Sequence, residues 1–122
     1  MEWIAKVLVG LVAFTHLYIM WFEMFAWTTR GRKVFRGFPK ELFEPTKPMA
    51  ANQGLYNGFL AAGLIWSFFV SSPWSANIAL FFFGCVAVAG IYGAATASKK
   101  ILYVQTVPAS IGIVFILLER YM

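Results

Sequence analysis

The segment from Pro48 to Ser98 contains no Asp, Glu, Lys or Arg. Over the whole chain of 122 residues, charged residues make up 12% and hydrophobic residues 61%. Soluble domains have about 25% charged residues, and a chain this short cannot bury so many apolar side chains in one soluble core. The composition therefore argues against a soluble domain and predicts an all-α integral membrane protein.

The apolar segments are long enough for four membrane-spanning helices, because one crossing needs roughly 20 mostly apolar residues. The sequence SSPWS divides the charge-free run, since Pro73 favours a helix start and the serines favour a turn. The first helix is expected to be retained, because no small-residue cleavage site follows it. Pro108 is expected to bend the last helix. We predict one transmembrane domain, residues 1–122, as a compact bundle with helices at about 3–27, 50–70, 74–97 and 100–120.

The distribution of Lys and Arg predicts how the chain is oriented in the membrane. Loop 28–49 carries six basic residues, and Lys99 and Lys100 lie in the third loop, which four crossings place on the same side. The opposite side carries only Lys6 and Arg120. Because basic loops stay in the cytoplasm, we expect loops one and three to be cytoplasmic and both termini to lie outside the bacterial inner membrane. On this interpretation, the net charge of +5 comes from the excess of Lys and Arg in the cytoplasmic loops.

Loop 28–49 also mixes its basic residues with three aromatic residues, Phe35, Phe38 and Phe43. This pattern is found both in nucleic-acid patches and in segments that lie on membranes. In a membrane protein, anionic lipid headgroups are the expected partner, and we predict no nucleic-acid binding. The loop is expected to lie on the membrane surface.

Two ionisable residues interrupt the apolar stretch HLYIMWFEMFAW: His16, the chain's one histidine, and Glu23, one of five acids. Seven residues are nearly two helical turns, so both side chains share one face and lie about 10 Å apart along the axis. We expect them to face the interior of the bundle as a pair that donates and accepts a proton. The sequence leaves the charge state of Glu23 open.

Polar residues on the other three helices also gather in the half nearest the cytoplasm. A charge at the centre of a membrane costs about 2.5–3.5 kcal/mol even on the mild insertion scales, so polar groups at one depth should collect inside the bundle. With Glu23 and His16 as the catalytic pair, we predict a site whose ligand-binding residues are Asn52, Gln53, Tyr56, Asn57, Tyr92 and Gln105.

Simpler interpretations of the same residues remain open. Amide side chains between helices also serve as packing contacts worth about 0.6 kcal/mol each, and Glu23 lies close enough to an interface to reach the headgroups. One His and one Glu on the same helix fall short of a usual metal ligand set, so no metal or cofactor is predicted. Cys85 stands alone in an apolar run, which excludes an intrachain disulfide.

Small residues recur at four-residue spacing on two of the expected helices. Such faces allow two helices to approach closely. These small-residue faces could pack against other helices of the same bundle or form the contact of a homodimer, and the sequence does not distinguish the two. The faces consist of Gly54, Gly58 and Ala62 on one helix, and of Cys85, Ala89, Gly93 and Ala97 on the next.

Three blocks, HLYIMWFEMFAWTT, MAANQGLYNGFLAAGLIW and AGIYGAATASKKILYVQ, resemble the bacterial membrane family known as domain of unknown function 1304. The resemblance covers nearly the whole chain. It implies a small membrane protein of four helices and implies no activity.

Three functions fit these observations. The first is a pocket, on the cytoplasmic side within the membrane, that binds a small amphipathic molecule and transfers a proton to or from it. The second is a proton-coupled exporter of small molecules, similar in outline to the small multidrug-resistance transporters; the strong charge bias here would require a parallel oligomer. The third is a structural accessory subunit in which the polar cluster only holds helices together. The residues leave open whether the protein is an enzyme.

Overall fold

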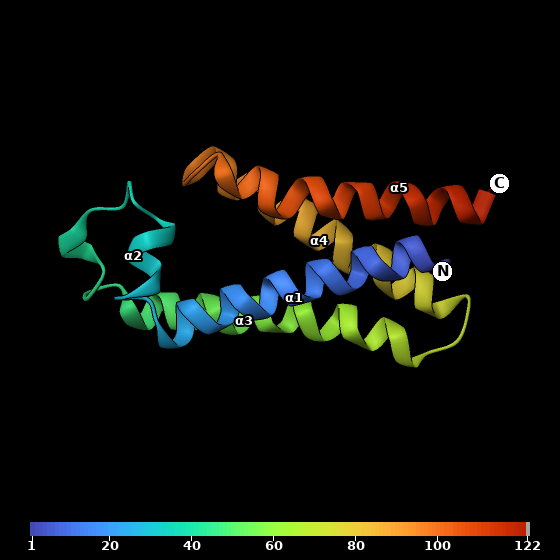
Figure 1. Ribbon diagram of the computed structural model, residues 1–122, viewed down its shortest axis with the longest axis horizontal. Coiled ribbons are helices and arrows are strands. Elements are labelled where there is room, and N and C mark those ends of the chain that lie inside the picture. Colours follow the sequence, from blue (N-terminus) through green and yellow to red (C-terminus); the bar gives the residue numbers. More distant parts are fainter. Residues whose placement is uncertain (122) are drawn as a thin grey trace. The chain divides into compact units, whose positions relative to one another are not determined.

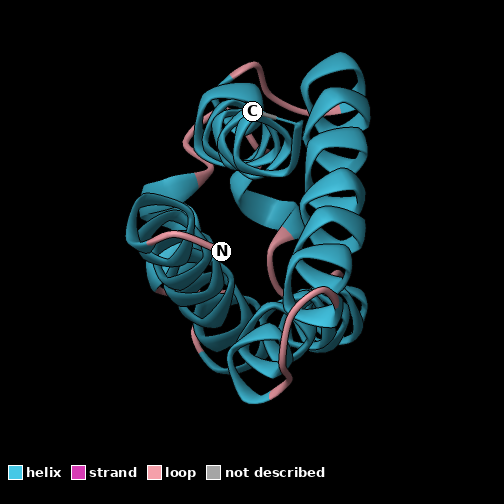
Figure 2. Cartoon of the chain, turned by 90° about the vertical axis from the view of Figure 1, so that its right-hand side faces the viewer, coloured by secondary structure: helices cyan, strands magenta, loops and turns pink. Residues whose placement is uncertain are grey.

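The computed structural model describes residues 1–121, and within that range every regular element is a helix (Figure 2). The elements follow one another along the chain as Figure 1 shows. They are α1 (Trp3–Phe25), α2 (Arg30–Val34), the 3-10 turn η1 (Lys40–Leu42), α3 (Lys47–Trp66), the 3-10 turn η2 (Ser67–Phe69), α4 (Trp74–Thr96), the π turn η3 (Leu102–Thr106) and α5 (Val107–Tyr121).

Three helical segments within residues 1–121 are long and apolar enough to cross a membrane: Trp3–Phe25, Trp74–Thr96 and Leu102–Tyr121. They agree closely with three of the four predicted spans, and α4 starts directly after Pro73 as expected. The predicted second span corresponds to α3, which is helical over 20 residues. It is less apolar because it carries Asn52, Gln53 and Asn57, so a count of four crossings stays a prediction.

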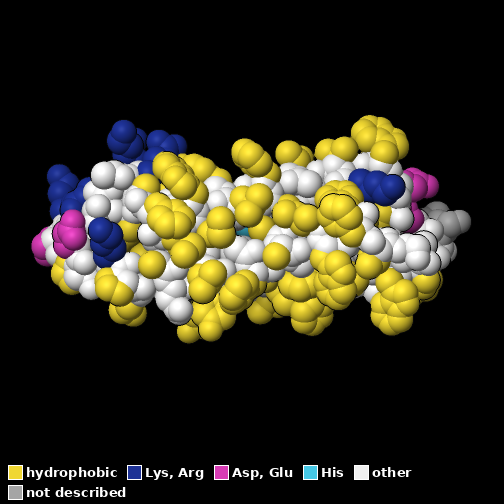
Figure 3. Space-filling model, turned by 90° about the horizontal axis from the view of Figure 1, so that it is seen from below, with side chains coloured by type: hydrophobic (Ala, Val, Ile, Leu, Met, Phe, Trp, Pro, Cys, Tyr) yellow, Lys and Arg dark blue, Asp and Glu magenta, His cyan; other side chains and the backbone are white. Residues whose placement is uncertain are grey.

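The surfaces of the apolar helices also fit a membrane environment. Large hydrophobic side chains point outward, including Phe14 and Phe25 on α1 at 72% exposure each, and Phe81 on α4 at 66%. On the face in Figure 3, hydrophobic side chains lie over much of the surface, and several of the Lys and Arg side chains gather over loop 26–46. Exposed apolar surface of this kind marks contact with lipid or protein.

The chain divides into two compact units. The first unit contains Met1–Ala13 and the chain from Leu60 onward, and the second contains Phe14–Phe59. The helices α1 and α3 each contribute residues to both. The core of the first unit is built from small and branched residues around Phe83 and Leu64, both with 0% exposure. Its other buried members include Ala5, Val9, Val86, Ala109 and Ile116.

The segment directly before Pro108 departs from regular α-helix, while the predicted bend of the last helix stays a prediction. A proline has no N–H and its ring collides with the carbonyl four residues earlier. The turn just before Pro108 is a π turn, in which the N–H of Val107 donates to the carbonyl of Leu102. In membrane helices, local π adjustments of this kind help to re-satisfy the backbone groups that a proline leaves without partners.

The π turn packs against α4 inside the first unit. The Thr106 hydroxyl donates a hydrogen bond to the Ala87 carbonyl at 3.0 Å. This contact requires Gly90, because a Cβ there would overlap the Thr106 hydroxyl and lie 2.9 Å from the Thr106 backbone nitrogen. Gly84, on the same helix, has nothing within 4 Å of the corresponding position.

We therefore expect Gly90→Ala to destabilise the protein and Gly84→Ala to leave it unchanged or slightly more stable. Overpacking costs about 1–3 kcal/mol, whereas replacing an unconstrained helical glycine with alanine gains up to about 1 kcal/mol. Thermal unfolding in detergent, followed by circular dichroism, measures both. A Gly90→Ala melting temperature equal to that of Gly84→Ala would show that the contact between α4 and the π turn is not tight.

Candidate functional site

In the second unit, the C-terminal half of α1 lies beside the N-terminal half of α3 (Figure 1). Two glycines of α3 face α1. A Cβ on Gly54 would lie 2.9 Å from the Cβ of Glu23, and a Cβ on Gly58 would lie 2.6 Å from the sulfur of Met20. The small-residue face of α3 thus packs within the unit at these two positions. A homodimer through small-residue faces stays a prediction.

The close approach brings the Glu23 carboxylate against two amide side chains. Gln53 Nε2 donates to Glu23 Oε2 at 2.8 Å, and Asn57 Nδ2 donates to Glu23 Oε1 at 2.7 Å. Asn57 Nδ2 also donates to the Gln53 carbonyl at 3.2 Å. Gln53 and Asn57 are four residues apart on α3, so they share one face, as their spacing predicts.

This arrangement supplies hydrogen-bond donors to a carboxyl group that is almost wholly buried. Glu23 is 2% exposed, and burial of an unpaired carboxylate is very costly. Each oxygen receives one N–H, and hydrogen bonds to an ionised acceptor are shorter and stronger than neutral ones. The two amides therefore fix the direction of both carboxylate oxygens, and each oxygen keeps a lone pair that could accept a further donor.

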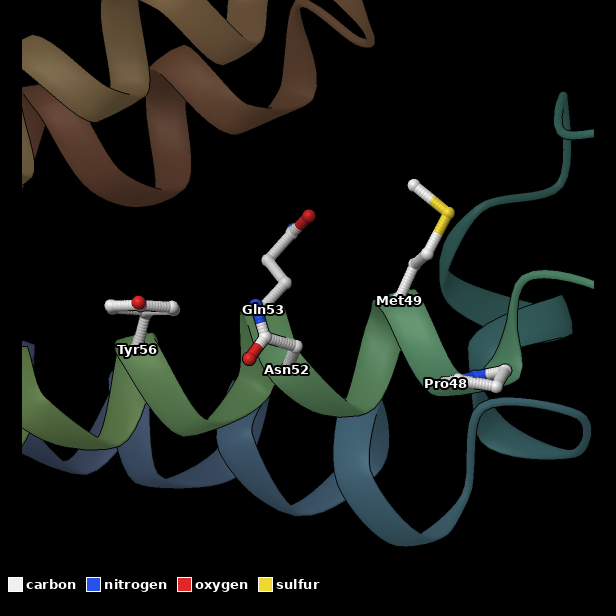
Figure 4. A pocket seen from close by; sticks show the side chains of 5 residues that line it. All are labelled: Pro48, Met49, Asn52, Gln53 and Tyr56. Atoms are coloured by element: carbon white, nitrogen blue, oxygen red, sulfur yellow. The ribbon is translucent and has the colours of Figure 1, made fainter.

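A hollow of about 530 Å³ runs along α3 next to this carboxylate–amide cluster. All of its lining residues belong to α3: Pro48, Met49, Asn52, Gln53 and Tyr56. Figure 4 shows Met49 and Gln53 extending from the helix into the space beside it. We call this hollow the α3 groove. Gln53 belongs to both features, because it lines the groove and also donates to Glu23.

The predicted site residues fall into four groups in the structure. Glu23, Gln53 and Asn57 are brought together by hydrogen bonds, and Asn52 and Tyr56 join Gln53 in the α3 groove. His16 has 0% exposure on α1, as expected for an interior histidine.

Tyr92 and Gln105 belong to the first unit, where the Tyr92 side chain is 71% exposed. Their membership of the site stays a prediction, and so do the functional roles assigned to every predicted site residue.

Sequence reasoning did not single out Met20, Pro48 or Met49. Met20 packs against Gly58, and the two others line the groove. An apolar side chain in an apolar helix carries no local sequence signal that marks it as a helix contact or as part of a groove. The glycine spacing on α3 was the one available hint that a bulky α1 residue would lie opposite. Within residues 1–121, no three His, Cys, Asp or Glu side chains form a group that could hold a metal ion.

We expect Asn57→Ala to destabilise the protein by about 1–3 kcal/mol, because one buried carboxylate oxygen loses its donor. Asn52→Ala is the matched control, since the Asn52 side chain is exposed and lies outside the cluster. Chemical or thermal unfolding in detergent gives both values. Coupling between Asn57→Ala and Glu23→Ala in a double-mutant cycle isolates the pair. Additive effects of the two substitutions would contradict the hydrogen bond.

The sequence matches the family described as "Protein of unknown function (DUF1304)" over residues 10–117. It is also 35% identical over 97 residues to the "Uncharacterized protein YpaA" of Lactococcus lactis subsp. lactis (strain IL1403), an alignment that covers 78% of this chain and 81% of the relative. No solved structure matches the chain. The family match spans nearly all of the described helices, so the chain belongs to the DUF1304 family.

Proposed function

We propose that this protein is an integral membrane protein that binds a small amphipathic molecule in the α3 groove. One observation carries the proposal: Gln53 lines the groove and at the same time donates a hydrogen bond to the buried Glu23 carboxylate. An intramembrane ionisable residue is expensive, and it usually marks a functional site. The groove gives this residue an adjacent space for a ligand.

The lining of the groove indicates the chemistry of the ligand. Asn52, Gln53 and Tyr56 offer neutral hydrogen-bond donors and acceptors, while Pro48 and Met49 offer apolar surface. None of the five lining side chains is charged. A molecule with one polar, neutral end and an apolar body fits this set best. Small-molecule sites combine apolar surface with a few placed polar groups, and the groove supplies both kinds.

Glu23 takes part in proton transfer if the ligand replaces Gln53 as its partner. Gln53 is exposed, so its side chain can turn away without leaving a core position. A ligand hydroxyl or other proton donor would then bond Glu23 Oε2, while Asn57 keeps Oε1 in place. In this mechanism Glu23 is the general base or acid, Asn57 orients it, and His16 is a second proton carrier two turns along α1.

The proposal includes four crossings, with α3 as the second. Gln53 and Asn57, two of the residues that make α3 more polar, donate hydrogen bonds to the Glu23 carboxylate. Their amide groups therefore need not turn toward lipid to find partners. The Lys and Arg bias then places loop 26–46 in the cytoplasm and both termini outside the bacterial inner membrane.

This topology predicts which introduced cysteines react from outside the cell. In a Cys85→Ser background, Ser72→Cys should react with a membrane-impermeant maleimide in intact cells, and Arg36→Cys should react only after the cells are opened. The measurement is the labelled fraction of each variant. Labelling of both cysteines from the same side would mean that α3 does not cross, and the reversed pattern would mean that the termini are cytoplasmic.

Ligand binding is tested by native mass spectrometry of the protein purified in mild detergent. We expect the wild type to carry a small molecule of defined mass, and Glu23→Gln to lose at least about 90% of it, because the carboxylate no longer holds the groove residues or accepts the ligand's proton. Glu44→Gln is the matched control. It removes the same charge from an exposed loop position and should keep the ligand.

Two other outcomes would replace the proposal. A wild type without any bound molecule, in the same oligomeric state as Glu23→Gln, would favour the accessory subunit. Proton-driven uptake of a small cation into inverted vesicles, lost in Glu23→Gln, would favour an exporter that works as a parallel oligomer. The exporter has one observation in its support, the carboxylate buried in a membrane-spanning helix.

A further inference from the structure

Loop 26–46 is folded around an aromatic cluster rather than extended over the surface. The indole of Trp27 lies 5.8 Å from the Phe35 ring, 5.9 Å from the Phe38 ring and 5.1 Å from the Phe43 ring, measured between centroids. Trp27 Nε1 donates to the Thr46 hydroxyl at 3.0 Å, which ties the start of the loop to its end. These contacts join the start, the middle and the end of the loop.

One of the loop's cations is used to hold this fold. Arg32 Nε donates to the Thr28 carbonyl at 2.6 Å, and its Nη1 donates to the Lys40 carbonyl at 3.1 Å. Its guanidinium also lies 4.9 Å from the centre of the Phe43 ring, a cation–π distance. Arg30 is likewise engaged, because its Nε donates to the Tyr18 hydroxyl at 2.6 Å.

Three further cations in the loop point outward. Lys33, Arg36 and Lys40 are exposed, and within residues 1–121 their charged groups have no hydrogen-bond or ion-pair partner. The loop and its flanking Lys47 carry six basic residues against two acids, so its field is positive. Figure 3 shows the Lys and Arg side chains gathered at this end of the second unit.

Exposed apolar side chains stand on the two helices that precede and follow this loop in the chain. Phe25, at the end of α1, is 72% exposed, and Met49, in the first turn of α3, is 73% exposed. A nucleic acid would satisfy the cations but leave this apolar surface uncovered. An anionic phospholipid satisfies both, because its phosphate meets the cations while its acyl chains lie against the helices.

We propose that Lys33, Arg36 and Lys40 bind the phosphate groups of anionic phospholipids in the leaflet that loop 26–46 faces. Arg32, beside Lys33, contacts the Lys40 carbonyl, and Phe35, beside Arg36, packs on Trp27, so the segments that carry the three cations are joined within the loop. The proposal does not depend on the ligand of the α3 groove.

Native mass spectrometry of the full-length protein in mild detergent tests this, with dioleoyl phosphatidylglycerol and dioleoyl phosphatidylcholine as probes. We expect tighter binding of phosphatidylglycerol. Lys33→Gln with Arg36→Gln should lower that affinity about 25-fold, from about fivefold per cation near an anionic surface, and leave phosphatidylcholine binding unchanged. The charge-matched control, Lys6→Gln with Arg120→Gln, removes two cations from the side predicted to lie opposite to loop 26–46 and should stay within about twofold of the wild type. Equal losses in both variants, or no preference in the wild type, would overturn the proposal.

Two further experiments test whether the cations prefer a lipid headgroup to other anions, and whether Arg32 acts by holding the fold of the loop. An equal concentration of inorganic phosphate, or of a single-stranded oligonucleotide, should not displace the lipid; displacement by either would overturn the proposal. Arg32→Gln should lower the melting temperature and keep the lipid preference of the folded protein. Loss of preference in Arg32→Gln with an unchanged melting temperature would contradict the assignment of the three outward cations.

Discussion

The carboxylate of Glu23 is the constraint around which the second unit is built. It lies on an apolar helix with 2% of the residue exposed, so protein groups must replace the water it has lost. Two amides from α3 do this, one for each oxygen. They reach it because Gly54 and Gly58 have no side chains to separate the two helices. A larger residue at either glycine would meet Glu23, Met20 or Met24 first. Helix contact and charge solvation therefore depend on each other.

The need to give polar groups hydrogen-bond partners also shapes two irregular segments, the π turn Leu102–Thr106 and loop 26–46. Where Pro108 removes a backbone donor, the helix widens into a π turn and Thr106 donates to an α4 carbonyl. Where the chain leaves α1, Arg32 supplies donors to two carbonyls of loop 26–46 and Trp27 closes the loop through Thr46. In each case a side-chain donor hydrogen-bonds to an acceptor elsewhere in the chain and ties the irregular segment to its surroundings.

The cluster also suggests why the α3 groove lies where it does. Gln53 must be long enough to reach Glu23 and close enough to the surface to line the groove. A ligand that competes for Gln53 would change the solvation of the carboxylate at once. Binding in the groove and the state of Glu23 would then be coupled through one side chain, without any motion of the helices.

The sequence alone determined the helices and the presence of an interior acid. Observed and predicted bounds agree within a few residues, 3–25 against 3–27 and 74–96 against 74–97, because apolar length and the Pro73 turn are local signals. It also placed Gln53 and Asn57 on one face, since that depends only on helical periodicity. Only the tertiary structure decided that these two amides meet Glu23 while Asn52 and Tyr56 line the groove instead. The reason is that periodicity gives the angle of a side chain around its own helix, whereas the neighbour it meets depends on how closely and in what register two helices pack.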